Sequence, residues 1–248
     1  IKMFEVIFWL LVGLLVYTYI GYPLLLFIFS IFIKKPIIKS SNYFPKVSLI
    51  ITAYNEEKVI EDKIKNSLGL DYPKNKIQII IGSDGSTDNT DEIVKKYVNK
   101  EIILNRVEGR KGKTATLNSS VKKASGEILI FSDANSIYNK NAIKELIKHF
   151  AHPKIGCVCG QLSYKTLNPS IKGEEVYWRY EKLIKKLESI TGSITGANGS
   201  IYAARKKLFQ PLGDGLDDDF IAPLICYKKG FRSIFEPLAI SIEKLDLP

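Results

Sequence analysis

The chain has 248 residues, which is enough for one large α/β domain with a sizeable core. Its 36 lysines and arginines outnumber its 26 aspartates and glutamates. The resulting net charge of +10 favours binding to phosphates, to nucleic acid or to an anionic membrane surface, or it serves only to keep the chain soluble. Its three cysteines, Cys157, Cys159 and Cys226, do not provide a disulfide framework, and we expect them to be buried thiols in a reducing compartment.

The N-terminal segment is predicted to span a membrane. Between Met3 and Ile33 the only charged residue is Glu5, and about 20 apolar residues suffice to cross a bilayer. No small-residue cleavage site follows, so a removed signal peptide is not expected, and a buried hydrophobic helix is the alternative. Four lysines follow the segment within the next 13 residues, which orients the rest of the chain to the cytoplasm. The predicted boundaries are a transmembrane segment over 1–33, a linker over 34–46 and a globular domain over 47–248.

Apolar runs alternate with helical patterns in the first half of that domain. Residues 47–52, 77–81 and 102–104 are predicted strands, and the first two are each followed by an amphipathic helix. Asn55 is the expected N-cap of the first of these helices. This alternation predicts an α/β fold built on a mostly parallel sheet with right-handed crossovers.

A basic, glycine-bearing loop over residues 106–113 precedes a helix that carries Leu117 and Val121 on one face. Lysines at the start of a helix are unfavourable for its dipole unless an anion binds there. The segment is therefore either an anion-binding loop or a solvated one.

The next predicted strand, residues 128–131, leads to Asp133. Ligands in open α/β sheets bind beyond the carboxyl ends of the strands. Asp133, with Asn135 two residues on, offers hard oxygen ligands for Mg²⁺ or Mn²⁺, and capping of a turn or helix is the alternative.

The second half is less regular. A helix is expected over 142–150, and a long one, from about 171 to 189, is expected to bury Val176, Tyr180, Leu183 and Leu187. Four further strands are predicted over residues 158–163, 201–204, 233–235 and 240–242. Three adjacent aspartates at 217–219 precede a helix that ends near residue 230. They either complement the dipole of that helix or include a positioned base.

Six segments, in the same order along the chain, resemble the motifs of a known protein family. The sequence resembles the family 2 glycosyltransferases, inverting enzymes with the GT-A fold that include the processive synthases of cellulose, hyaluronan and poly-N-acetylglucosamine. The matching segments are VSLIITAYNEE (47–57), IIGSDGSTD (80–88), GKTATLN (112–118), FSDAN (131–135), TGANGS (195–200) and DDDF (217–220). The resemblance covers about residues 47–237, so the predicted globular domain is expected to be a GT-A catalytic domain.

The resemblance implies a donor site on the first four segments. Ala53, Tyr54 and Glu56 match the first nucleotide contact, and Asp84 matches the second. Lys113 lies where a positive charge would face the donor diphosphate.

It also implies the metal, catalytic and acceptor residues. Asp133 matches the first carboxylate of the Asp-x-Asp metal motif. Asp219 matches the catalytic base, eleven residues before a glycine, and Asp218 takes the place of the glutamate that precedes the base. The acceptor-side loop corresponds to three residues, Gly196, Ala197 and Asn198.

Two features depart from the family pattern. Asn135 replaces the last aspartate of the metal motif, so this ligand position has an oxygen but no charge. Family members that make long polymers usually carry a Gln-x-x-Arg-Trp motif and further transmembrane helices, and this sequence stops just where they would follow. We therefore expect the C-terminal transmembrane part to lie outside it.

The expected function is transfer of a sugar, with inversion, from a nucleotide-diphosphate donor to a glycan or lipid-linked acceptor at the cytoplasmic membrane face. UDP is the expected nucleotide by family frequency, and Mg²⁺ or Mn²⁺ is the expected cofactor. The alternatives are a sugar nucleotidyltransferase and a degenerate, non-catalytic nucleotide-binding partner. Nucleic-acid binding is not expected, because the lysines are spread over many helices and no recognised motif is present.

Overall fold

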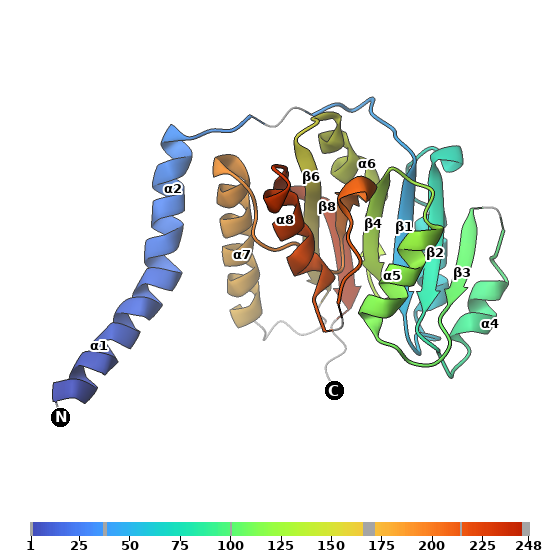
Figure 1. Ribbon diagram of the computed structural model, residues 1–248, viewed down its shortest axis with the longest axis horizontal. Helices are drawn as coiled ribbons and strands as arrows, with labels where there is room; N and C mark the ends of the chain where they lie inside the picture. The colour runs from blue at the N-terminus through green and yellow to red at the C-terminus, as the bar shows by residue number, and fades with distance from the viewer. Residues whose placement is uncertain (1, 37–38, 100, 166–171, 214, 245–248) are drawn as a thin grey trace.

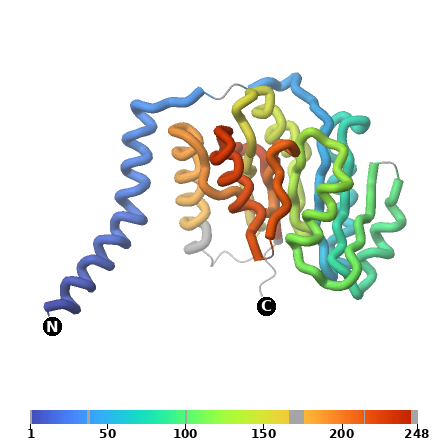
Figure 2. The backbone as a smooth tube through the Cα atoms, in the orientation of Figure 1, coloured from blue at the N-terminus to red at the C-terminus, as the bar shows by residue number. Residues whose placement is uncertain are grey.

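A computed structural model describes residues 2–36, 39–99, 101–165, 172–213 and 215–244 (Figures 1 and 2). Within these residues the β-strands are β1 (Val47–Ala53), β2 (Ile77–Ser83), β3 (Ile102–Arg106), β4 (Ile128–Asp133), β5 (Ile137–Tyr138), β6 (Ile155–Lys165), β7 (Tyr202–Arg205) and β8 (Arg232–Lys244). The α-helices are α1 (Lys2–Val16), α2 (Tyr22–Phe32), α3 (Ile60–Leu68), α4 (Thr90–Lys95), α5 (Lys113–Lys123), α6 (Ala142–Ile147), α7 (Lys172–Thr191) and α8 (Asp218–Lys228).

The strands form one mixed sheet in the order β3-β2-β1-β4-β7-β6-β8-β5. The half that contains β3, β2, β1 and β4 is parallel, as predicted, and β7 joins β4 in the antiparallel direction. Because β1 lies between β2 and β4, the loops after these three strands meet at one edge of the sheet. This arrangement positions the candidate site.

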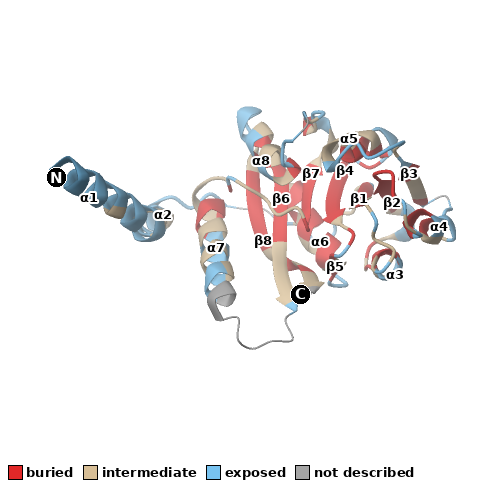
Figure 3. Ribbon diagram, turned by 90° about the horizontal axis from the view of Figure 1, so that it is seen from below, coloured by how far each residue is buried: buried red, intermediate tan, exposed pale blue. Residues whose placement is uncertain are grey.

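Most of the sheet is buried (Figure 3), and it carries two large hydrophobic cores. Alternate residues of β1 belong to different cores: Leu49 and Ile51 are in the core that includes residues of α3 and α6, whereas Ile50 is in the core that includes residues of α5 and α8. The fully buried runs of β1, β2 and β4 explain their near-continuous apolar sequence. The three cysteines are buried and unbridged, as expected.

The N-terminal helix extends away from the sheet (Figure 1). Residues Lys2–Phe32 are helical and by length and composition could cross a membrane. A π-helical turn, Tyr17–Gly21, interrupts the α-helical hydrogen bonding inside this helix. The second half of the helix lies against α7, where the Tyr22 hydroxyl donates to Glu188 Oε1 at 2.7 Å.

Several local predictions were wrong. Asn55 does not cap α3; it adopts the left-handed conformation, with φ of 55°, and α3 starts five residues later. Val176 and Leu183 of α7 are exposed rather than buried, because only part of this helix faces the sheet. The helix expected over 142–150 ends in a 3₁₀ turn, Lys148–Ala151.

The two closing strands are one element, β8. Phe235 pairs with Cys159 and Ile240 pairs with Gln161, so the residues between them bulge out of the ladder. Pro237 lies in this bulge, where its missing N–H breaks no ladder hydrogen bond. In the sequence, the proline and the irregular pattern around it interrupt the strand signal, so one bulged strand was predicted as two short ones.

Candidate active site

The loops after β1 and β2 are tied to each other by hydrogen bonds. The backbone N–H of Glu56 donates to Thr90 Oγ1 at 2.8 Å, and that of Glu57 donates to Asp88 Oδ2 at 3.0 Å. The amide side chain of Asn55 accepts from the backbone N–H of Thr87 at 2.8 Å. These bonds fix the backbone of the first two matching segments side by side.

Asp84 fixes the basic loop. Its carboxylate accepts from the backbone N–H groups of Lys111 and Gly112 at 2.8 and 2.9 Å, and from Thr116 Oγ1 at 3.1 Å. The loop also approaches Gly85, where an added Cβ would lie 2.6 Å from backbone atoms of Gly109. Asp84 thus holds the loop over the ends of the strands.

A cavity of about 410 Å³, here called the strand-end cavity, opens beneath this loop. Its lining includes every residue predicted to contact the donor: Ala53, Tyr54, Glu56, Asp84, Lys113 and Asp133, together with Asn135. The Arg110 guanidinium lies over the Tyr54 ring, 4.3 Å from its centroid. Burial and the charges of Asp133 and Asp88 raise the pKa of Glu56.

A second cavity of about 560 Å³, the α7–α8 cavity, shares Lys113 and Asp133 with the first. Between the cavities, Lys113 Nζ lies 2.6 Å from Asp133 Oδ1. Partial burial alone would lower the pKa of Lys113, but Asp133, Asp218 and Asp219 outweigh it and raise that pKa. The ammonium is therefore a permanent positive charge between the cavities.

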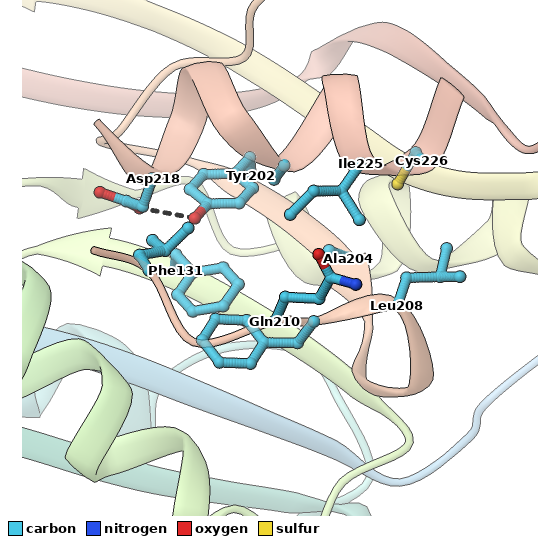
Figure 4. A pocket seen from close by; sticks show the side chains of 11 residues that line it. Phe131, Tyr202, Ala204, Leu208, Gln210, Asp218, Ile225 and Cys226 are labelled. Carbon is cyan, nitrogen blue, oxygen red and sulfur yellow. Dashed lines mark hydrogen bonds between the residues drawn. The ribbon is translucent and has the colours of Figure 1, made fainter. Parts of the chain in front are cut away.

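The three adjacent aspartates have different surroundings. Asp217 is exposed at the start of α8. Asp218 is buried and accepts a 2.5 Å hydrogen bond from the Tyr202 hydroxyl (Figure 4), and burial raises the pKa of its carboxyl. Asp219 lies in the lining of the α7–α8 cavity, and its backbone carbonyl accepts from the N–H of Ala197 at 2.9 Å.

Gly199 lies where these charged groups converge. A methyl group added there would be 3.4 Å from Asp219 Oδ2, 3.5 Å from Lys113 Nζ and 3.7 Å from Asp133 Oδ2. The absence of a side chain at Gly199 leaves room for a reacting group between a carboxylate and a cation.

The structure brings most predicted site residues together. Asp218, Asp219, Ala197 and Asn198 line the α7–α8 cavity, whereas Gly196 does not line it and lies near Phe220. The prediction missed Gly199, although this residue is in the matched TGANGS segment. It also missed the contacts that Asp84 and Tyr202 make, because their partners are distant in sequence.

Asp133 and Asn135 offer oxygen atoms to a cation at the strand-end cavity. In the part of the chain that the structure describes, no cluster of three histidine, cysteine or acidic side chains forms a ready-made metal site. Two protein oxygens suit Mg²⁺ or Mn²⁺ held jointly with substrate phosphates and water. The donor set therefore fits a metal that binds together with a diphosphate.

This fold and its site geometry define a class, the GT-A glycosyltransferases. A mannosyltransferase from Pyrobaculum calidifontis, solved with GDP-Man and Mn²⁺, superposes with a TM-score of 0.76 at 26% identity, over 92% of this chain and 66% of that one. TarS from S. aureus, solved with UDP-GlcNAc, superposes at 0.61 with 20% identity, over 82% of this chain and 59% of that one, and supports the fold alone.

Sequence comparison places the chain within this class. Residues 48–213 match the model of glycosyl transferase family 2, and the chain belongs to that family. The poly-beta-1,6-N-acetyl-D-glucosamine synthase of Staphylococcus aureus (strain COL) is 31% identical over 216 residues, which are 84% of this chain and 52% of that protein. The synthase of Staphylococcus epidermidis is 28% identical over 78% of this chain and 48% of its own length. The chain thus spans about half the length of these relatives.

Proposed function

We propose that this chain carries the catalytic domain of an inverting glycosyltransferase that uses a nucleotide-diphosphate sugar. The observation that carries the proposal is the junction of the two cavities, where Lys113, Asp133 and Asp219 converge on the space beside Gly199. A donor in the strand-end cavity and an acceptor in the α7–α8 cavity would meet at this point.

Each donor-side residue has a task that its position supports. The ends of β1 and β2, with Ala53, Tyr54 and Asp84, would hold the nucleoside, and Lys113 would contact the diphosphate with a full positive charge. Asp133 and Asn135 would hold Mg²⁺ or Mn²⁺ with the diphosphate. When bound, the metal would stabilise the negative charge that develops on the leaving group.

Asp219 would act as the general base. Its carboxylate would accept the proton of an acceptor hydroxyl, whose oxygen attacks the anomeric carbon from the face opposite the diphosphate. The bond between that carbon and the diphosphate oxygen breaks, and its electron pair leaves with the nucleoside diphosphate. Asp218, held by Tyr202, would keep the start of α8 in place.

The relatives narrow the substrates. The poly-N-acetylglucosamine synthases favour a glycan or lipid-linked acceptor. UDP is proposed as the nucleotide of the donor by family frequency, with GDP as the alternative because the mannosyltransferase was solved with GDP-Man. The Mn²⁺ in the same mannosyltransferase complex supports a divalent cofactor. We further propose a transmembrane segment over 1–33, a linker over 34–46 and a catalytic domain over 47–248 at the cytoplasmic face, because lysines follow the apolar helix.

Calorimetric titration of UDP into the detergent-solubilised chain, with and without Mn²⁺, tests the donor site. We expect metal-dependent binding that Asp133→Ala abolishes and that Asn135→Asp strengthens, because the aspartate adds a charged ligand. Binding of equal strength without metal and in Asp133→Ala would contradict the metal site. Release of pyrophosphate from UTP and a sugar 1-phosphate, with no release of UDP from a UDP-sugar, would indicate a nucleotidyltransferase instead.

A further inference from the structure

Part of the lining of the α7–α8 cavity is aromatic. It consists of Tyr164, at the end of β6, and of Tyr177 and Trp178 on α7. The centroid of the Trp178 ring lies 5.1 Å from that of Tyr164 and 5.2 Å from that of Tyr177. Trp178 is the middle ring of the three, and its neighbours on two different elements restrict its position.

The rest of the lining is polar. Glu181 lies one turn after Trp178 on the same helix, and Asn198 and Asp219 complete this part of the cavity. Lys185 holds the Glu181 carboxylate at 2.7 Å and also donates to the backbone carbonyl of Ala197 at 3.2 Å. The polar groups are therefore anchored to the same scaffold as the rings.

An aromatic surface beside carboxylate and amide groups matches the chemistry of a saccharide. A pyranose ring presents C–H groups on its faces, which pack on an apolar ring, and hydroxyl groups around its edge, which donate to carboxylates and amides. An alkyl chain would match the rings but would desolvate Glu181 and Asn198 without adding a hydrogen bond to those that they already make with Lys185 and Ser200, which is costly. A cavity of about 560 Å³ is also within the usual range for small-molecule sites.

Resting on the proposed glycosyltransferase function, we propose that the acceptor is a saccharide and that one of its rings stacks on Trp178. Glu181 and Asn198 bind hydroxyl groups at the edge of the saccharide, and the reacting hydroxyl lies beside Asp219. Trp178 is then a specificity residue for the acceptor and takes no part in donor binding.

The tryptophan content of the chain allows a direct test. Only Trp9 and Trp178 are present, and Trp9 is in the exposed N-terminal helix, so Trp9→Phe leaves Trp178 as the single reporter. The full-length variant, with UDP and Mn²⁺ bound, is titrated with β-1,6- and β-1,4-linked N-acetylglucosamine tetrasaccharides and with mannotetraose. Stacking removes water from a partly exposed indole, so we expect a saturable blue shift with at least one of them. No shift with any of the three, while UDP binds, would overturn the proposal.

The octyl β-glycoside of N-acetylglucosamine separates sugar from alkyl recognition. A shift with the free tetrasaccharide supports stacking of a sugar ring, whether or not the natural acceptor also carries a lipid. A shift with the octyl glycoside alone would mean that the rings bind an alkyl chain, and the proposal would fail.

Kinetics provide the second test. With the tetrasaccharide that shifts the emission as acceptor, Trp178→Ala is expected to raise the acceptor KM roughly tenfold, and Trp178→Phe less than threefold. The kcat and the Kd for UDP stay unchanged in both. Tyr227→Ala, which removes an exposed ring of α8, is the matched control. An unchanged acceptor KM in Trp178→Ala would refute the role of Trp178, whereas failure of the parent chain to bind any of UDP, GDP and dTDP would refute the proposed function itself.

Discussion

Lys113 and Asp133 form an ion pair, with 2.6 Å between Nζ and Oδ1, at the boundary that the strand-end cavity shares with the α7–α8 cavity. The two residues come from the start of α5 and the end of β4. Their contact places one positive and one negative charge at the point where donor and acceptor would meet. The positive charge is unusual at the N-terminus of a helix and is explained if an anionic diphosphate binds there.

Replacement of Lys113 by methionine tests this explanation. We expect the Kd for UDP to rise about tenfold or more, because a charge-assisted hydrogen bond to the diphosphate is lost. Uridine lacks the diphosphate, so its weaker binding should not change. Lys111→Met, on the same loop, is the control, because only the backbone of Lys111 contacts Asp84. Equal effects on UDP and uridine would show that Lys113 acts on the fold rather than on the diphosphate.

A methyl group at Gly199 would fill the space between the charged groups. Gly199→Ala introduces only ordinary van der Waals contacts, of 3.4 to 3.7 Å, with the nearest side-chain atoms, so the fold should tolerate it. We expect a melting temperature close to that of the parent chain and a loss of roughly 100-fold in kcat/KM, because the reacting atoms are displaced. Normal turnover in this variant would place the reaction elsewhere.

Glu236 makes folding sensitive to acid. Its burial alone would raise the pKa, but the contacts with His149, at 2.6 Å, and Lys148, at 3.0 Å, lower it to about 2. The unfolded chain therefore binds more protons below about pH 4.5, so the stabilisation is complete above that pH and is lost as the pH falls toward 2. Burial lowers the pKa of His149, which adds to the loss below about pH 6.5.

Urea unfolding of the parent chain and of Glu236→Gln at pH 6 and pH 3 measures this effect. As the pH falls from 6 to 3, protonation linked to this carboxylate should lower the free energy of unfolding of the parent chain by roughly 2 kcal/mol. Glutamine does not titrate, so the variant should not show this loss. The variant should be less stable at pH 6 but should show a flatter pH dependence. Parallel pH profiles for the two proteins would contradict the lowered pKa of Glu236.

The parallel half of the sheet could be predicted because β1, β2 and β4 are buried on both faces and each shows a short apolar run. The place of Asp133 in a ligand site could be predicted by the same reasoning, because a carboxylate that ends such a strand lies at the ligand-binding edge of the sheet. The particular roles of Asp84 and Asp219 followed only from the family resemblance, whereas the basic loop that ends at Lys113 already indicated either an anion site or a solvated loop. In the structure, all three residues line one or both of the two cavities.

Other features depend on contacts that the sequence does not display. Val176 and Leu183 fit an amphipathic pattern, but only part of α7 packs on the sheet, so the pattern overestimated the burial of this helix. The difference between Asp217, Asp218 and Asp219 depends on Tyr202, a residue of another strand. The role of Gly199 depends on the charged side chains around it, and only the folded chain brings them together.

The rate of UDP release from UDP-N-acetylglucosamine, measured with the tetrasaccharide that binds, tests the central claim most directly. For Asp219→Asn the account predicts a loss of roughly 10²- to 10⁴-fold in kcat. The calorimetric Kd for UDP should stay within about twofold, since Asp219 does not line the strand-end cavity. The control variant Asp217→Asn, which changes an exposed neighbour of Asp219, should retain most of the activity. Turnover of Asp219→Asn at the parent rate, with intact UDP binding, would contradict the assignment of Asp219 as the general base.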